Sequence, residues 1–320
     1  MLRQLCYNLT LAAACLASAT IATGVSAEDK WPTREVRVYV PGSPGGPTDL
    51  IARTFQPFLE KEVGVPVIVV NQGGGGGIVA SNTVLAAKGD GGTLMITHAL
   101  LHSAKVFGLT EITYKDFAAI GTISEADNVL VARADAPYNT LQELHDYAEA
   151  NPGKVVIASF FGGMGQTMSD ALETWSGDTL RSVDIGTDSD KLTSVLGQQT
   201  DLALLAKNTA QQYVDAGQLK VLALLNERPD PQHPDWPLPK SANLDLAVPL
   251  VYTLYAPASM PDALQQRLGE TLKKIVESDD FAKATARIDQ LPVYRDAEAT
   301  KTHLEREFNF FQKTIKSSGK

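Results

Sequence analysis

Cysteine is almost absent from this sequence. Its 320 residues include two cysteines, Cys6 and Cys15, both within the first fifteen positions. The rest of the chain therefore offers neither a disulfide nor a thiol nucleophile. Positive charge is also in deficit, because 28 lysines and arginines face 37 aspartates and glutamates, for a net charge of −9. The basic residues are scattered and form no run, which argues against a nucleic-acid partner.

Long hydrophobic runs are confined to the amino-terminal end. Residues 9–25 are apolar or small, and Val25-Ser26-Ala27 has the small-x-small pattern that precedes signal-peptidase cleavage. We predict a removable secretory signal over residues 1–27 and a periplasmic mature protein. The alternatives are an uncleaved membrane anchor, for which the run is marginal, and a lipoprotein that uses Cys15. No later segment is long and apolar enough to span a membrane, so the mature chain is not expected to do so.

Catalytic and cofactor motifs are lacking as well. The glycine-rich run has no following Gly-Lys-Ser/Thr of a phosphate-binding loop, and no serine stands in Gly-x-Ser-x-Gly. His98 and His102 would bracket a metal if they were helical, but no third ligand has a matched spacing. A polar or surface pair is the simpler interpretation of these histidines. We therefore predict no metal, no cofactor and no enzymatic activity.

Three glycine-rich turns stand out in what remains, and each follows a β-branched strand pattern and precedes a helical pattern. They occupy residues 41–49, 71–77 and 160–165. A helix start presents unpaired backbone N–H groups and the positive end of the helix dipole. In α/β sheets, such turns lie at the carboxyl edge, where ligands bind. The pattern indicates an anion-binding site.

The order of the motifs resembles one family. Pro44-Gly45-Gly46-x-x-Asp49 and the turn from Asn71 to Gly77 come first, followed by Gly89-Asp90-Gly91-x-Thr93-Leu94 and Asn151-Pro152-Gly153-Lys154. This order is similar to that of the substrate-binding proteins of tripartite tricarboxylate transporters, and the resemblance extends over the whole mature chain. It implies an α/β, type II-like, two-lobed periplasmic binding protein. Each lobe would be a mostly parallel sheet flanked by helices, with a ligand cleft between the lobes.

The resemblance also implies boundaries and partners. Residues 28–130 and 251–320 would form the first lobe, and residues 131–250 the second, with closure by a hinge motion. The expected partners are a small carboxylate ligand and integral-membrane transporter subunits, and the protein is expected to be a monomer. Chain-specific residues in the third turn, and Val183-Asp184-Ile185-Gly186, depart from the family pattern. The ligand is therefore less constrained than the fold.

Ligand-binding residues follow from the resemblance and from these departures. They are Ser43, Gly45, Gly46, Thr48, Asp49, Gly73, Gly74, Gly75, Gly76, Thr97, Phe161, Gly162, Gly163, Gly165, Gln166, Thr167, Asp184 and Thr187. Asp49 has two possible roles: it complements the helix dipole and pairs with Arg53, or it contacts a hydroxyl or amine of the ligand. Phe160 and Phe161 either wall the cleft, which would favour an apolar or aromatic ligand body, or complete the core face of their strand.

The sequence thus predicts a periplasmic solute-binding protein that captures a small organic anion for a tripartite membrane transporter. One alternative keeps the fold and makes the protein an extracytoplasmic ligand-sensing input to a signalling system. The other is a secreted enzyme.

Overall fold

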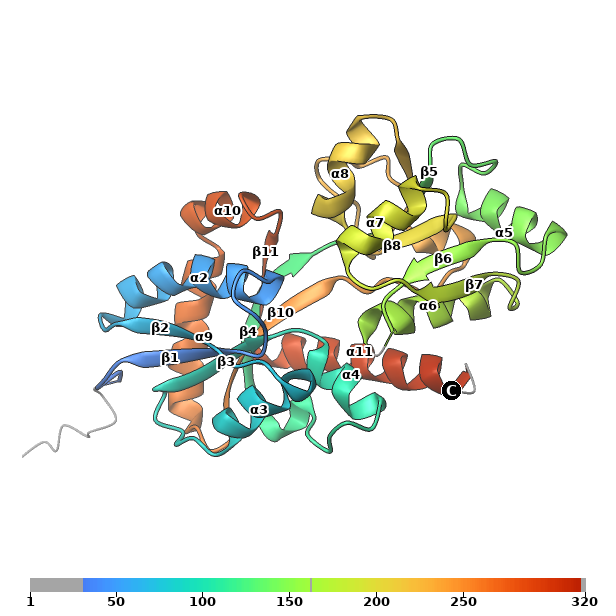
Figure 1. The fold of residues 1–320 in the computed structure, drawn as a ribbon. Coiled ribbons are helices and arrows are strands. Elements are labelled where there is room, and N and C mark those ends of the chain that lie inside the picture. Colours follow the sequence, from blue (N-terminus) through green and yellow to red (C-terminus); the bar gives the residue numbers. More distant parts are fainter. Residues whose placement is uncertain (1–30, 162, 318–320) are drawn as a thin grey trace, which may run out of the picture.

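Two lobes make up the molecule, and each is built on one β-sheet covered by helices on both faces (Figure 1). The computed structural model describes residues 31–161 and 163–317, with side chains as far as residue 314. The predicted signal segment, residues 1–27, and the predicted site residue Gly162 lie outside the described residues.

The first sheet has six strands in the order β11-β4-β10-β3-β1-β2. They are β1 (Val36–Val40), β2 (Val67–Asn71), β3 (Thr93–Thr97), β4 (Phe117–Ala126), β10 (Leu250–Pro257) and β11 (Leu291–Arg295). The helices around it are α2 (Pro47–Val63), α9 (Asp262–Val276) and α10 (Asp279–Ala286) on one face and α3 (Ile78–Leu85), α4 (Leu100–Val106) and α11 (Ala297–Ser317) on the other. Strand β1 shows why both faces of the sheet are covered, because its side chains alternate between them. Val36, Val38 and Val40 join the core cluster on one face, while Tyr39 packs against the cluster on the other.

The second sheet has five strands in the order β7-β6-β8-β5-β9. They are β5 (Asn128–Arg133), β6 (Val156–Ser159), β7 (Arg181–Asp184), β8 (Leu202–Ala206) and β9 (Leu219–Leu224). Its faces are covered by α5 (Leu141–Ala150) and α6 (Met164–Trp175) on one side and by α7 (Asp188–Leu196) and α8 (Lys207–Asp215) on the other. Short 3₁₀ turns complete the chain at Gly75–Gly77, Tyr114–Asp116 and Pro239–Ala242.

The predicted two-lobed α/β architecture is confirmed, but the sheets are mixed rather than mostly parallel. Strands β1, β2 and β3 run parallel, whereas β10 is antiparallel to β3 and β4, and β5 is antiparallel to β8 and β9. The crossing between lobes is the reason. The chain leaves the first sheet as β4, enters the second as β5 with only Asp127 between them, and returns later as β10, which runs opposite to β4.

Helix α10 and strand β11 complete the first lobe between α9 and α11. Strand β11 contains Pro292 and pairs irregularly with β4 at the edge of the sheet, so its sequence carries little strand pattern. The five-proline segment 228–239 has no strand and no α-helix, as expected from the missing backbone donors.

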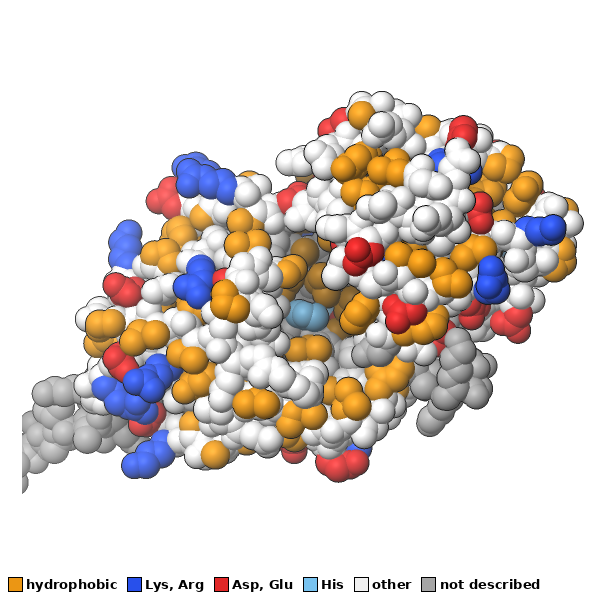
Figure 2. Space-filling model, in the orientation of Figure 1, with side chains coloured by type: hydrophobic (Ala, Val, Ile, Leu, Met, Phe, Trp, Pro, Cys, Tyr) orange, Lys and Arg blue, Asp and Glu red, His pale blue; other side chains and the backbone are white. Residues whose placement is uncertain are grey.

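The turns after the strands lie between the lobes. Figure 1 shows the carboxyl ends of β1 and β3 directed toward the second lobe and that of β6 directed back toward the first. Figure 2 shows a hollow at this place with a histidine side chain inside it. The chain passes from the first sheet to the second at Asp127, close to the predicted boundary between residues 130 and 131. The lobe boundaries themselves stay a prediction. None of the helices within residues 31–161 and 163–317 has the length and apolar character needed to cross a membrane.

Candidate functional site

The first glycine turn is ordered by Asp49. This side chain is 2% exposed, and its carboxylate accepts hydrogen bonds from the backbone N of Gly45 at 2.8 Å, Arg53 Nε at 2.9 Å and Asn71 Nδ2 at 2.9 Å. Burial opposes ionisation of Asp49, but these donors outweigh it and hold the pKa of the carboxyl below its ordinary value. Asp49 therefore organises the turn, and its predicted contact with a ligand stays a prediction.

The second turn packs directly against the first. Asn71 also donates to the carbonyl oxygen of Gly42 at 3.3 Å, which links the end of β2 to the first turn. Gly74, Gly75, Gly76 and Gly77 all have positive φ, a backbone conformation that other residues rarely adopt. A Cβ atom on Gly77 would come within 2.8 Å of Leu100 and 3.2 Å of Pro41. A side chain at residue 77 would therefore collide with Pro41 of the first turn and with Leu100 of α4, so glycine is needed here.

The third turn, between β6 and α6, belongs to the second lobe. A Cβ atom on Gly165 would lie 2.7 Å from the carbonyl oxygen of Phe160, so this glycine is required by close backbone approach. The backbone N of Phe161 donates to Asp184 Oδ1 at 3.3 Å, and the backbone N of Ile185 donates to the carbonyl oxygen of Ser159 at 3.0 Å. These two hydrogen bonds therefore hold the third turn against the end of β7 and the residue that follows it.

Some of the buried polar atoms without a hydrogen-bond partner lie at the carboxyl ends of strands. Among the described residues they include Gln72 Oε1 after β2, Thr97 Oγ1 at the end of β3, His98 Nδ1 directly after it, and Ser159 Oγ at the end of β6. A buried polar group left unpaired costs about 1–3 kcal/mol. Such atoms at the ends of three strands indicate a place where water or a polar ligand completes the hydrogen bonding.

His98 is the histidine of this strand-end group. Its ring packs edge-on against Tyr252 with the ring centroids 5.7 Å apart. Burial, reinforced by repulsion from His102, lowers the pKa of His98 to about 4 against the attraction of Glu307. The imidazole is therefore neutral near pH 7 and presents a neutral hydrogen-bonding atom.

The two histidines of the predicted pair have different surroundings. His98 precedes α4, whereas His102 lies within it, is 1% exposed and has its Nε2 3.0 Å from Glu307 of α11. Of the predicted polar or surface pair, the surface location is wrong for His102, because aromatic rings of Tyr114 and Phe308 pack around it, whereas its contact with Glu307 is polar.

The predicted site residues divide by exposure. Exposed residues are Ser43, Gly45, Gly73, Gly74, Gly75, Gly76, Asp184 and Thr187, partly exposed ones are Gly46, Phe161, Gly163, Gly165 and Gln166, and buried ones are Thr48, Asp49, Thr97 and Thr167. Thr187 caps α7, and its hydroxyl donates to Asp190 at 2.6 Å. The sequence analysis did not select Gln72, His98 or Ser159 as ligand-binding. Their position at strand ends was the available signal.

Ion pairs join the lobes behind the hollow. Lys207, at the start of α8, lies 2.8 Å from Asp230 and 3.0 Å from Asp289 of the first lobe. The buried Glu125, near the end of β4, pairs with Arg228, which follows β9, and with Arg295 of β11. These contacts stabilise one relative placement of the lobes.

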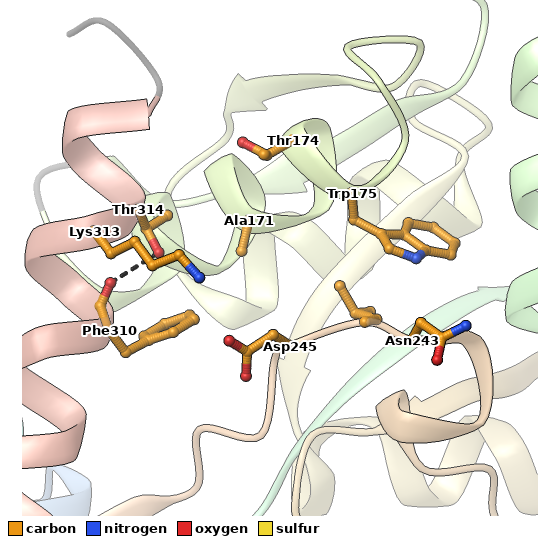
Figure 3. A pocket seen from close by; sticks show the side chains of 9 residues that line it. Ala171, Thr174, Trp175, Asn243, Asp245, Phe310, Lys313 and Thr314 are labelled. Atoms are coloured by element: carbon orange, nitrogen blue, oxygen red, sulfur yellow. Dashed lines mark hydrogen bonds between the residues drawn. The ribbon is translucent and has the colours of Figure 1, made fainter.

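Two other features are separate from the turns. Figure 3 shows a pocket of about 180 Å³ between α6 and α11, where Trp175, Asp245 and Phe310 contribute to the lining. It includes none of the predicted site residues. On α5, His145, Asp146 and Glu149 bring potential metal-ligand atoms within 4.8 Å of one another, but exposed acidic groups commonly cluster without an ion. We assign no metal to them.

Comparison with known proteins places this geometry in a family. A family model described as "Tripartite tricarboxylate transporter family receptor" matches residues 51–319. The chain belongs to this family. A UPF0065 protein of Bordetella pertussis, strain Tohama I, is 31% identical over 266 residues, which is 80% of this chain and 80% of that relative.

Solved structures show the fold of the family in this chain. A TctC solute-binding protein from Polaromonas has a TM-score of 0.83 at 24% identity, covering 90% of this chain and 99% of its own. Rpa4515 of R. palustris, solved with adipate, has a TM-score of 0.73 at 22% identity, covering 90% of this chain and 98% of its own. The predicted resemblance to tripartite tricarboxylate transporter receptors is therefore confirmed, and so is the two-lobed binding-protein fold.

Proposed function

We propose that this receptor captures a small organic carboxylate in the periplasm, between its lobes, and delivers it to the membrane subunits of a transporter. The observation that carries the proposal is the position of three glycine turns beside the unpaired buried atoms of Thr97, His98 and Ser159. Both kinds of feature provide neutral hydrogen-bonding groups at strand ends. The unpaired amide oxygen of Gln72 only accepts hydrogen bonds and would suit a water or a ligand hydroxyl instead. Residues 1–27 are proposed as the export signal.

Neutral donors are sufficient for this task. A hydrogen bond to a charged group contributes about 1.5–3 kcal/mol, so about four of them approach the ~8 kcal/mol of a micromolar complex. Arg53 is held by Asp49 and Asn71 and does not need to contact the ligand. The similarity to a fold neighbour that was solved with adipate supports a carboxylate as the ligand.

Ligand binding can be tested on the purified chain from residue 28 onward. Thermal-shift screening against a broad organic-acid panel, followed by calorimetric titration of every hit, is expected to find at least one saturable carboxylate ligand. The corresponding amides are the matched controls, since they retain shape and lose the charge. A folded protein that no acid stabilises at millimolar concentration would refute the proposal.

The partner is a separate question with a separate test. Cross-linking in intact cells, followed by affinity capture of the receptor, is expected to recover integral-membrane transporter subunits. Recovery of a sensor kinase in their place would favour the signalling alternative.

A further inference from the structure

Acidic residues lie beside the third turn in the second lobe, in a segment that is bordered by Arg181 and Lys191. Residues 159–167 and 182–190 contain no lysine or arginine, whereas Asp184, Asp188 and Asp190 all lie in the second of these segments. Asp190 is occupied in capping α7, and Lys191 holds Asp188 at 2.6 Å. Asp184 is exposed, and among the described residues it accepts a hydrogen bond from the backbone N of Phe161 at 3.3 Å and is in none of the ion pairs.

An aromatic ring stands beside this charge. Phe160 is 51% exposed, although phenylalanine is usually buried. Its backbone is fixed by the close approach of Gly165, and its ring edge lies 3.9 Å from the position of a Cβ on Gly163. The third turn therefore presents an exposed apolar ring, which is suited to covering the body of a ligand rather than to binding its charged group.

The first lobe offers the opposite character. Helices α2 and α3 begin at its two turns, and the positive ends of their dipoles favour an anion there. At α2 the backbone N–H groups of Gly45 and Gly46 are already bonded, to Asp49 and to the carbonyl oxygen of Ser43. Neutral His98 adds a hydrogen-bonding atom without negative charge. A carboxylate is therefore favoured on the first-lobe side. A second carboxylate on the same ligand would reach the second lobe, where it would meet Asp184 and Phe160 on two segments that carry no lysine or arginine.

We propose that the ligand is a monocarboxylate with an apolar body, whose carboxylate is held by the first lobe and whose body is covered by Phe160 of the second. This inference rests on the proposed function and makes it more specific. The proposed ligand has one carboxylate, whereas adipate, with which the fold neighbour was solved, has a carboxylate at each end.

Matched acids test the inference directly. Hexanoate and adipate share a six-carbon chain and differ in the second carboxylate, while benzoate adds a flat aromatic body. Calorimetric titration of the folded receptor is expected to give tighter binding of hexanoate and benzoate than of adipate, by about tenfold or more, equivalent to about 1.4 kcal/mol. Phe160→Ala is expected to weaken hexanoate and benzoate by about tenfold. Asp184→Asn is expected to raise the affinity for adipate by more than it changes the affinity for hexanoate.

The control is Tyr147→Ala, which removes another exposed aromatic ring, on α5, away from the three turns. It is expected to leave all three affinities unchanged. Adipate binding more tightly than hexanoate, with no response to Asp184→Asn or Phe160→Ala, would overturn this inference and leave the proposed function standing. Absence of binding by any carboxylate in the broad panel would instead remove the proposed function, and the inference with it.

Discussion

Replacing Asp49 by alanine is expected to destabilise the first lobe and weaken ligand binding together. The carboxylate is buried and accepts bonds from the backbone N of Gly45 at 2.8 Å and from Asn71 at 2.9 Å. Each bond to a charged acceptor contributes about 1.5–3 kcal/mol, while the half-exposed Arg53 adds less than about 1 kcal/mol. We expect Asp49→Ala to lower the free energy of unfolding by about 3–5 kcal/mol.

Urea denaturation measures the stability, and calorimetry with the best carboxylate from the panel measures affinity. Asp90→Ala is the matched control, because Asp90 also accepts from a turn backbone, that of Gly92 at 2.9 Å, but at the opposite end of β3. It should cost stability without altering affinity. The pKa of Asp49 is lowered on folding, so its stabilisation is present above about pH 3.8 and is lost as pH falls through the folded value. A loss below about 1 kcal/mol for Asp49→Ala, or unchanged affinity, would refute the assigned role.

Three further results are expected. The pKa of His98 falls from 6.5 to about 4 on folding, so protonation at low pH favours the unfolded state. Urea denaturation should show that the free energy of unfolding of the wild type falls by about 3 kcal/mol more than that of His98→Gln between pH 6.5 and pH 4. Parallel pH profiles of the two proteins would contradict this. Gly165→Ala should lose ligand affinity in calorimetry because its Cβ would meet backbone at 2.7 Å, whereas Gly163→Ala, with 3.9 Å of room, should retain it. Lys207→Met leaves the buried Asp230 without its cation, so urea denaturation should show that the free energy of unfolding falls by about 3 kcal/mol. Asp289→Asn should lower it less, because Asp289 is partly exposed. Equal effects of the two substitutions would contradict this.

The strand-turn-helix units were accessible from sequence because their information is local. Pro47 begins α2, a position that suits proline because its missing N–H has no partner there, and the glycines of the second turn have the positive φ values that only glycine adopts easily. Asp49 could be assigned two roles from spacing alone. The structure adds Asn71 and the backbone of Gly45 as partners, which no spacing rule reveals because these contacts depend on how the two turns pack.

The features that could not be predicted from the sequence depend on contacts between segments that are far apart in the chain. Strand β10 lies between β3 and β4 although more than one hundred residues separate β10 from either strand, and this pairing makes the sheet mixed. His102 has the spacing of a surface histidine, yet its burial depends on α11 from the far end of the chain. The unpaired atoms of Thr97 and Ser159 become informative only when the two sheets are seen to point their strand ends at each other.

The position of β10 has a consequence for how the chain folds. The second sheet is continuous in sequence, from β5 to β9, whereas the first sheet remains incomplete until β10 and β11 arrive. Pairings between distant segments form slowly because the intervening chain must first be ordered or looped. The second lobe can therefore form early as an insert, while the half of the binding surface built on β1, β2 and β3 waits for the carboxyl-terminal third of the chain.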